Sequence, residues 1–197
     1  MRVLVACEYS GVVREAFRKR GHDAWSCDLL PADDGSIYHI QGDILLYLDK
    51  WAHLWDLMIA HPPCTHLAVS GARWWKGKEQ EQAEALDFVS NLMLAPIPQI
   101  AIENPVGIIS STIRKPDQIV HPYHFGHPVS KATCLWLKGL PLLKPTNVVE
   151  PEWVEFPNGK RQSKWYYETS LMPHHTRGHV RSRTFTGIGE AMANQWG

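Results

Sequence analysis

This sequence lacks the cysteine patterns that mark disulfide scaffolds and structural zinc sites. Its four cysteines are far apart, with no Cys-x-x-Cys pair and no zinc-like spacing. A chain of 197 residues buries a core large enough to fold without cross-links. We therefore expect a reduced protein with mostly buried thiols, folded as one domain with at most a small appendage.

Long apolar runs and sorting signals are also missing. No stretch is long and apolar enough to span a bilayer. The first residues lead directly into a strand-like run at 3–6, without the pattern of a signal peptide. We find no internal repeat or low-complexity tract. These absences predict a cytoplasmic protein.

A net charge is missing too, because 20 Lys and Arg balance 20 Asp and Glu. The distribution is nevertheless uneven, with an acidic excess in residues 1–110 and a basic excess in residues 111–197. Between Pro157 and Arg183, six basic residues accompany a single acid, Glu168, and alternate with Trp, Tyr and His. A basic stretch with interleaved aromatics is typical of nucleic-acid contact. A solvated surface loop is the alternative interpretation.

The chain alternates between strand-like and helical patterns. Apolar runs at 3–6, 24–27, 56–60 and 100–102 predict strands, helical spacing appears at 12–20 and 79–94, and a further strand is expected at 133–137 and a last helix at 189–195. This order predicts an α/β fold with a doubly wound, mostly parallel sheet. Residues 144–183 are rich in Pro, Gly, His and charge, and we predict no long element there.

Polar residues follow several of the predicted strands. In a doubly wound sheet, ligands bind beyond the carboxyl ends of the strands. The sequence therefore predicts a site built from Glu8, Asp28, His61, Cys64, Glu103 and Asn104.

The segment His61-Pro62-Pro63-Cys64 follows an apolar strand. Two prolines stiffen the loop and remove amide donors, so one side chain can be aimed. A thiolate in such a loop is a nucleophile if its pKa is lowered from about 8.5. A rigid loop with an incidental cysteine is the alternative.

The segment Glu103-Asn104-Pro105 ends a later strand. A partly buried carboxyl at a strand end can hold a proton near neutral pH. A turn-forming or capping pair is the alternative. The functional interpretation of each segment supports that of the other, because neighbouring parallel strands bring their carboxyl ends together.

Pro-Pro-Cys after one strand and Glu-Asn-Pro after another resemble the catalytic loops of the DNA cytosine-5 methyltransferase family. The resemblance implies a Rossmann-like methyltransferase fold with S-adenosylmethionine as methyl donor and S-adenosylhomocysteine as product. It covers roughly the first 140 residues and the last dozen. It implies a catalytic set of Cys64, Glu103, Asn104, Pro63, Lys131 and Thr133.

The same resemblance implies where the cofactor binds. Four segments match the family's cofactor motifs in order: the first strand and its loop, the acidic end of the second strand, Gly42-Asp43-Ile44, and the closing segment Thr186-Gly187-Ile188-Gly189. The implied set is Cys7, Glu8, Tyr9, Ser10, Gly11, Asp28, Leu29, Asp43, Ile44, His61, Pro62, Gly187 and Gly189.

The sequence also departs from the family. The first loop keeps one glycine of a usually glycine-rich turn, and Lys131 and Thr133 stand where the family has arginines. A full target-recognition domain does not fit. We expect a catalytic unit at 1–143, a short basic and aromatic recognition insert at 144–183 and a returning segment at 184–197. The compact pattern resembles bacteriophage versions, and we expect the protein in a bacterial or phage-infected cell.

DNA is the expected partner, with the target cytosine flipped out of the duplex. The expected DNA contacts are Arg73, Trp74, Lys160, Arg161, Lys164, Arg181 and Arg183. We expect no metal site, because the extended segment that holds His121, His124 and His127 does not converge those side chains.

The chemistry that the resemblance implies begins when the Cys64 thiolate adds to C6 of cytosine. Glu103 then contacts N3 and the exocyclic amine, and C5 takes the methyl group. Two alternatives stay open: C5 modification of a free cytosine nucleotide, and a non-catalytic DNA-binding relative. An amino-methyltransferase is disfavoured, because His61 precedes the two prolines and Cys64 follows them.

Overall fold

The computed structural model describes the backbone of residues 1–197 and every side chain except those of residues 72–74. Seven strands form the main sheet: β1 (Arg2–Ala6), β2 (Asp23–Asp28), β3 (His39–Gln41), β4 (Leu57–Ala60), β5 (Gln99–Pro105), β6 (Gln118–Val120) and β7 (Thr133–Lys138). The helices are α1 (Val12–Arg18), α2 (Ile44–Trp51), α3 (Glu79–Leu94), α4 (Ile109–Thr112), α5 (Lys164–Ser170), α6 (His174–Ser182) and α7 (Thr186–Trp196). Short 3-10 turns lie at Ala52–Leu54, Val69–Trp74 and Pro122–His124.

The strand order of the main sheet is β3-β2-β1-β4-β5-β7-β6. The pairs from β3 to β5 are parallel, while β7 runs antiparallel to both of its neighbours. The order reverses between β1 and β4, so a crevice opens beyond the carboxyl ends of these two strands. The predicted doubly wound, mostly parallel α/β sheet is confirmed.

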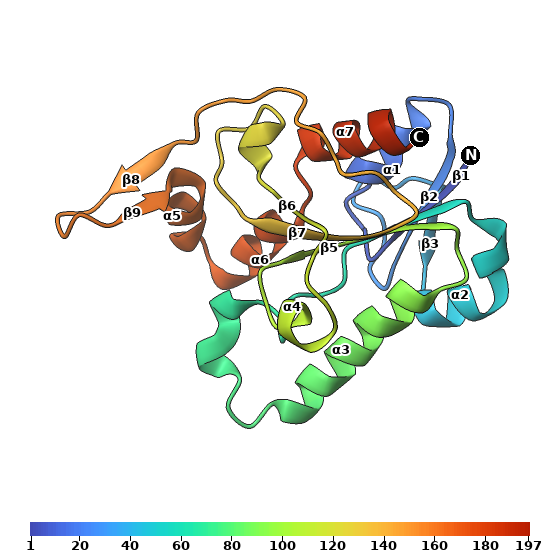
Figure 1. Cartoon of the computed structure of the whole chain (residues 1–197), viewed down its shortest axis with the longest axis horizontal. Helices are drawn as coiled ribbons and strands as arrows, with labels where there is room; N and C mark the ends of the chain where they lie inside the picture. Colours follow the sequence, from blue (N-terminus) through green and yellow to red (C-terminus); the bar gives the residue numbers. More distant parts are fainter.

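Helices cover both faces of this sheet (Figure 1). Along β1, Val3 and Val5 pack toward α1 and α7, whereas Leu4 and Ala6 pack toward α2 and α3. Successive side chains of a strand point to opposite faces, so a strand covered on both sides must be apolar throughout. This explains why the strands appear in the sequence as short continuous apolar runs. Both chain termini lie beside β1 and α7.

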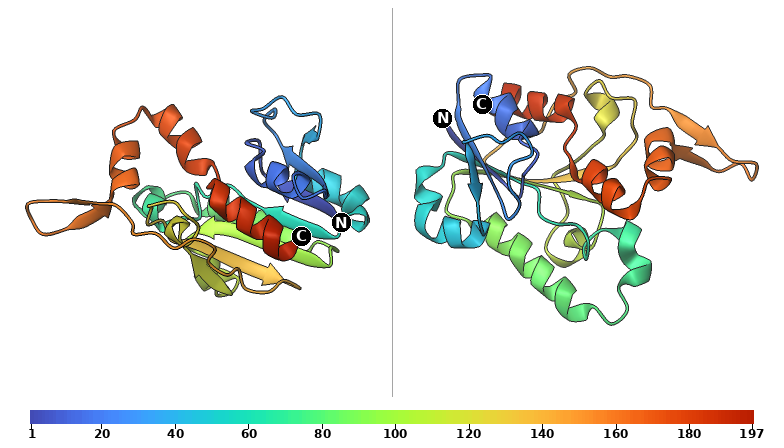
Figure 2. Two further views of the ribbon diagram at one scale, coloured as in Figure 1. Left: turned by 90° about the horizontal axis from the view of Figure 1, so that it is seen from above. Right: turned by 180° about the vertical axis from the view of Figure 1, so that it is seen from behind.

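The segment 144–183 consists of short elements, as predicted. Strands β8 (Trp153–Glu155) and β9 (Arg161–Ser163) pair antiparallel in a sheet of their own, followed by α5 and α6. Figures 1 and 2 show the hairpin projecting from the body at the end farthest from the termini. None of the described helices is long and apolar enough to cross a membrane.

A buried arginine organises the turn between β1 and α1. The side chain of Arg14 is fully buried, donates to Ser26 Oγ at 2.7 Å and forms ion pairs with Glu15 and Asp34. Gly11 is the N-cap of α1 and has a φ of 71°, and a Cβ at this position would collide with the Arg14 guanidinium. The single glycine kept in this loop is therefore required by both its backbone conformation and its neighbour.

We expect Arg14→Ala to lower the free energy of unfolding by roughly 2–5 kcal/mol, because a large buried side chain leaves a cavity behind. The loss also leaves the Ser26 hydroxyl without its charged donor. Urea denaturation followed by circular dichroism measures the effect. The matched control is Lys19→Ala at the exposed end of the same helix; an equally small change in both variants would contradict the prediction.

Candidate active site

The loop after β4 is tied to both neighbouring strands. The backbone amide of His61 donates to the Ala6 carbonyl at 2.9 Å, which continues the pairing with β1. On the other side, the buried Asn104 of β5 donates from Nδ2 to the Pro62 carbonyl at 2.7 Å. The two prolines restrict the backbone, and Asn104 fixes the loop to β5. The structure thus brings the Pro-Pro-Cys and Glu-Asn-Pro segments together at one edge of the sheet.

A buried charged pair also joins these segments. His61 Nδ1 lies 2.9 Å from Glu103 Oε2, and the two side chains are 9% and 16% exposed. Burial lowers the pKa of His61, but the hydrogen bond and the charges of Glu103 and Glu8 outweigh it and raise that pKa above its ordinary value. Burial acts on Glu103 in the opposite sense, yet His61 and Lys131 hold the pKa of this carboxyl below its usual range. Both shifts favour the ionised form of the pair.

Cys64 is the exposed thiol of this chain. The surrounding protein raises the pKa of Cys64, and the negative Glu103 raises it further, while Lys131 lowers it. Burial and nearby acids raise the pKa of the Cys27 thiol to about 12, so that thiol is inert. Cys64 combines access with a charged environment, and its raised pKa favours the neutral thiol.

Two adjoining cavities lie beyond the strand ends. The first, of about 250 Å³, is lined by Cys7, Cys27, Asp28, Leu29, Gly42, Asp43, Ile44, Pro63, Ala85 and Phe88. The second, of about 420 Å³, is lined by Cys7, Glu8, Tyr9, Ser10, Asp28, Leu30, His61, Pro63, Cys64, Thr65, Gly178 and residues 181–184. The cavities share Cys7, Asp28 and Pro63, so together they lead from Asp43 to Cys64.

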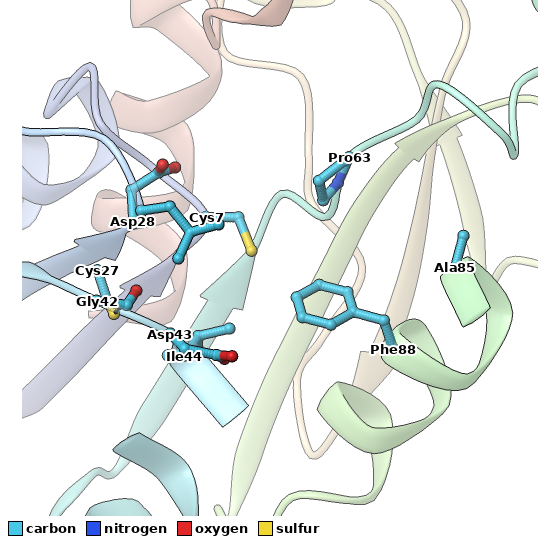
Figure 3. A pocket seen from close by; sticks show the side chains of 10 residues that line it. Cys7, Cys27, Asp28, Gly42, Asp43, Ile44, Pro63, Ala85 and Phe88 are labelled. Carbon is cyan, nitrogen blue, oxygen red and sulfur yellow. Dashed lines mark hydrogen bonds between the residues drawn. The ribbon is translucent and has the colours of Figure 1, made fainter. Parts of the chain in front are cut away.

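The first cavity fits a nucleoside. Figure 3 shows the ends of β1 and β2 and the start of α2 on one side, with Ala85 and Phe88 of α3 facing them. Its walls are mainly apolar, which suits a purine ring, and Asp28 and Asp43 supply acceptors for hydroxyl and amino groups. Each carboxylate uses one oxygen in a described contact, to the amides of Leu30 and Leu45 at 3.0 and 2.8 Å. The residues present therefore fit the adenosine part of S-adenosylmethionine.

The loop between β1 and α1 differs from a glycine-rich turn. Cys7 has a left-handed φ of 58°, a conformation that costs about 1–3 kcal/mol in a non-glycine residue. The buried Glu8 accepts from the amides of Val13 and Arg14 at 2.7 and 3.2 Å. Burial raises the pKa of Glu8 against the opposing effects of His61 and these amides. Glu8 thus occupies the helix N-terminus that a glycine-rich turn offers to an anionic ligand.

Helix α6 covers the second cavity, a contact that the sequence did not predict. The Tyr9 hydroxyl lies 2.9 Å from Ser182 Oγ and 3.1 Å from His179 Nδ1. Lys131 Nζ donates to the Arg181 carbonyl at 3.2 Å, which ties α6 to the segment that leads into β7. The basic half of the chain therefore forms one wall of the cavity beside Cys64.

The remaining predicted catalytic and cofactor residues lie in different places. Thr133 is buried in β7 opposite Pro105, and its hydroxyl donates to the Lys131 carbonyl at 3.4 Å. Gly187 and Gly189 lie in the first turn of α7, where a Cβ would meet the Phe125 carbonyl or approach the backbone of α1. These two glycines provide close packing and are not among the residues that line the two cavities.

The predicted DNA contacts fall into three groups. Lys160 and Arg161 are exposed on the projecting hairpin, and Lys164 at the start of α5 pairs with Glu152 at 2.9 Å. Arg181 and Arg183 line the second cavity. The side chains of Arg73 and Trp74 lie outside the described residues. Among the described side chains, no group of three His, Cys, Asp or Glu residues is arranged to hold a metal ion.

Sequence reasoning missed several lining residues. Ala85 and Phe88 lie three residues apart on α3, and neither was singled out from the helical pattern at 79–94. Gly178 and Ser182 come from a segment for which no long element was predicted. No local signal distinguishes these four residues from ordinary packing or surface positions.

The fold has neighbours among solved structures. A protein named as a DNA modification methyltransferase, encoded within a prophage of E. coli, matches with a TM-score of 0.51 at 15% identity, over 76% of this chain and 52% of that one. A DNMT2 variant from Spodoptera frugiperda matches with a TM-score of 0.44 at 17% identity, over 78% of this chain and 58% of that one. This chain thus spans a little over half the length of these neighbours. No family model and no curated protein matches the sequence. The predicted α/β, Rossmann-like fold is confirmed, and the prophage methyltransferase shares it.

Proposed function

We propose that this protein transfers a methyl group from S-adenosylmethionine to C5 of cytosine in DNA, through a covalent bond between Cys64 and C6. One observation carries the proposal. Cys64 and Glu103 lie at adjoining strand ends that Asn104 and His61 connect, beside a cavity that fits an adenosine. The prophage neighbour is named for DNA modification, and we propose the same substrate here.

In this proposal each residue has a distinct role. Cys64 adds to C6, which makes C5 nucleophilic, and Glu103 hydrogen-bonds N3 and the exocyclic amine as charge develops there. Asn104 and Pro63 hold the loop, and Thr133 at the start of β7 and Lys131 just before that strand support it. The cofactor supplies an electrophilic methyl group when it is bound. Loss of the C5 proton and release of Cys64 restore the aromatic ring.

Recognition is proposed to rest on the segment 144–183, between the catalytic unit 1–143 and the returning segment 184–197. Arg181 and Arg183 stand at the second cavity, and Lys160 and Arg161 are carried on the projecting hairpin. Basic side chains at these positions suit phosphates on both sides of a base that has left the duplex stack. Arg73, Trp74 and Lys164 are included in this proposed surface.

The proposed cofactor site leads to a binding prediction. We expect Asp43→Asn to weaken binding of S-adenosylhomocysteine about tenfold, because one charge-assisted hydrogen bond is replaced by a neutral one. Asparagine caps a helix as well as aspartate does, so α2 should be retained. Isothermal titration calorimetry measures the effect. Asp49→Asn, at an exposed position on the same helix, is the control, and equal affinities of the two variants would contradict the assignment.

Methyl transfer from a radiolabelled cofactor tests the function itself. Random-sequence duplex DNA and dCMP are offered separately, and the modified base is identified after digestion. Label in 5-methylcytosine from DNA supports the proposal. Label in dCMP alone would move the activity to free nucleotides, for which the short recognition segment leaves room. Failure of the wild-type protein to bind the cofactor at all would favour a non-catalytic DNA-binding protein.

A further inference from the structure

His61 is subject to the charges of two carboxylates, one on β5 and one in the loop after β1. Its Nδ1 contacts Glu103 on β5 at 2.9 Å, and the charge of Glu8, in the loop after β1, acts on the same imidazole. The side chain is nine-tenths buried, and its Nε2 has no hydrogen-bond partner among the described groups. A buried ring nitrogen without a partner is uncommon, so this residue requires an explanation beyond packing.

The charges around His61 favour its cationic form. Glu103 and Glu8 stabilise the imidazolium, whereas Lys131, in the segment before β7, opposes it. Cys64, on the same loop as His61, is a neutral thiol at rest because its pKa is raised. The two carboxylates outweigh both burial and Lys131. The shifts therefore favour an ion pair at rest, with the transferable proton on the imidazole hydrogen-bonded to Glu103.

An ionised Glu103 presents a difficulty for the proposed chemistry. A carboxylate can accept a hydrogen bond from the exocyclic amine of cytosine, but it has no proton to give to N3. When Cys64 adds to C6, electrons move from the C5–C6 bond toward C4 and N3, and N3 becomes strongly basic. The site then needs a proton donor at Glu103.

We propose that His61 supplies this proton, so that His61 and Glu103 act together as one general acid; this inference rests on the proposed function. The exposed Cys64 thiol first loses its proton to solvent. As the sulfur–C6 bond forms, the C5=C6 π electrons shift to C4–C5 and those of C4=N3 settle on N3. One proton leaves His61 Nδ1 for the Glu103 carboxyl, and one proton passes from that carboxyl to N3. The enamine is then neutral, His61 is neutral with its remaining proton on Nε2, and Glu103 is again ionised.

A kinetic experiment separates proton donation from positioning. The rate of covalent trapping on 5-fluorocytosine DNA is measured against pH for wild type, His61→Asn and His61→Ala. Asparagine places an amide donor near the position of Nδ1 but carries no transferable proton. We expect both variants to react about 10²-fold more slowly than wild type near neutral pH. We also expect the fall in rate at high pH, where His61 deprotonates, to disappear from both variants. His53→Asn, at an exposed position, is the control.

Recovery of the wild-type rate and pH profile in His61→Asn would overturn the inference, because it would leave His61 only a positioning role. A second measurement does not depend on activity. Nuclear magnetic resonance of the histidine ring nitrogens should show His61 cationic at pH 7 in wild type and titrating lower in Glu103→Gln. A neutral His61 in wild type would also overturn the inference. This titration measures the protonation of His61 even if no DNA reacts. Failure of the inference can therefore be distinguished from failure of the proposed function.

Discussion

Cys64→Ser should abolish covalent capture of the protein by DNA that contains 5-fluorocytosine. Fluorine at C5 blocks the final elimination, so an active enzyme remains attached to the base through its sulfur. A serine hydroxyl is a far weaker nucleophile at neutral pH, because so little of it is ionised. We expect a fall of at least about 10⁴-fold in adduct formation, a size seen when the nucleophile of a covalent enzyme is removed. Denaturing electrophoresis with labelled DNA measures it.

The matched control for this experiment is Cys134→Ala. Cys134 is buried in β7 and does not line either cavity beside the site. Its removal should leave the adduct intact apart from a modest loss of stability. The adduct should also require the cofactor, because fluorine traps the enzyme only after methyl transfer. An adduct of equal yield in Cys64→Ser would exclude this thiol as the nucleophile.

Glu103→Gln should lower the rate of adduct formation by about 10²–10⁴-fold, because general acid catalysis at N3 is lost. Glutamine keeps the shape of the side chain and can still accept a hydrogen bond from His61. The change therefore removes the charge of the side chain and its ability to pass a proton to N3, but keeps its shape. Single-turnover trapping measures the rate, and Glu81→Gln at the exposed start of α3 is the control.

The same variant should change how stability depends on pH. The pKa of Glu103 is lowered in the folded protein. Its contribution to the free energy of unfolding is therefore complete at pH values above its ordinary pKa, and it is lost as the pH falls through the lowered pKa. The pKa of His61 is raised. Its contribution to the free energy of unfolding is therefore complete at pH values below its ordinary pKa of about 6.5, and it is lost as the pH rises through the raised pKa. Wild type should lose stability on both sides of neutrality. Thermal melts of Glu103→Gln should show a flatter dependence, and identical curves would contradict the ion pair.

The His61–Glu103 pair connects these predictions. The cation on His61 keeps a buried carboxylate ionised beside a thiol whose pKa that carboxylate raises. The raised pKa lowers the fraction of Cys64 thiolate, and with it the reactivity of the site at rest. In the proposed step, His61 loses its positive charge only when its proton passes to N3 of a bound base, which happens as the Cys64 sulfur adds to C6. Such coupling would restrict covalent chemistry to a base seated against Glu103.

Local features of the sequence determined the sheet edge at which the candidate site lies. The apolar runs of β1, β4 and β5, and the prolines after β4, are signals within a few residues, so they predicted the strand ends that carry His61, Cys64 and Glu103. The bounds of α3 at Glu79–Leu94 were predicted for the same reason, since helical spacing begins after Lys78 and prolines follow Leu94. Strands β3 and β6 were not predicted, because three residues are too few to show a periodic pattern.

Only the tertiary structure decided how these residues meet. The contact of His61 with Glu103 spans 42 positions, that of Asn104 with Pro62 the same number, and that of Tyr9 with His179 spans 170. No local preference encodes such pairs, because they arise when the strand order places β4 between β1 and β5 and when α6 returns over the crevice. The sequence by itself determined which residues stand at the ends of the strands, and packing of the sheet and helices decided their partners, their charges and the cavity that they share.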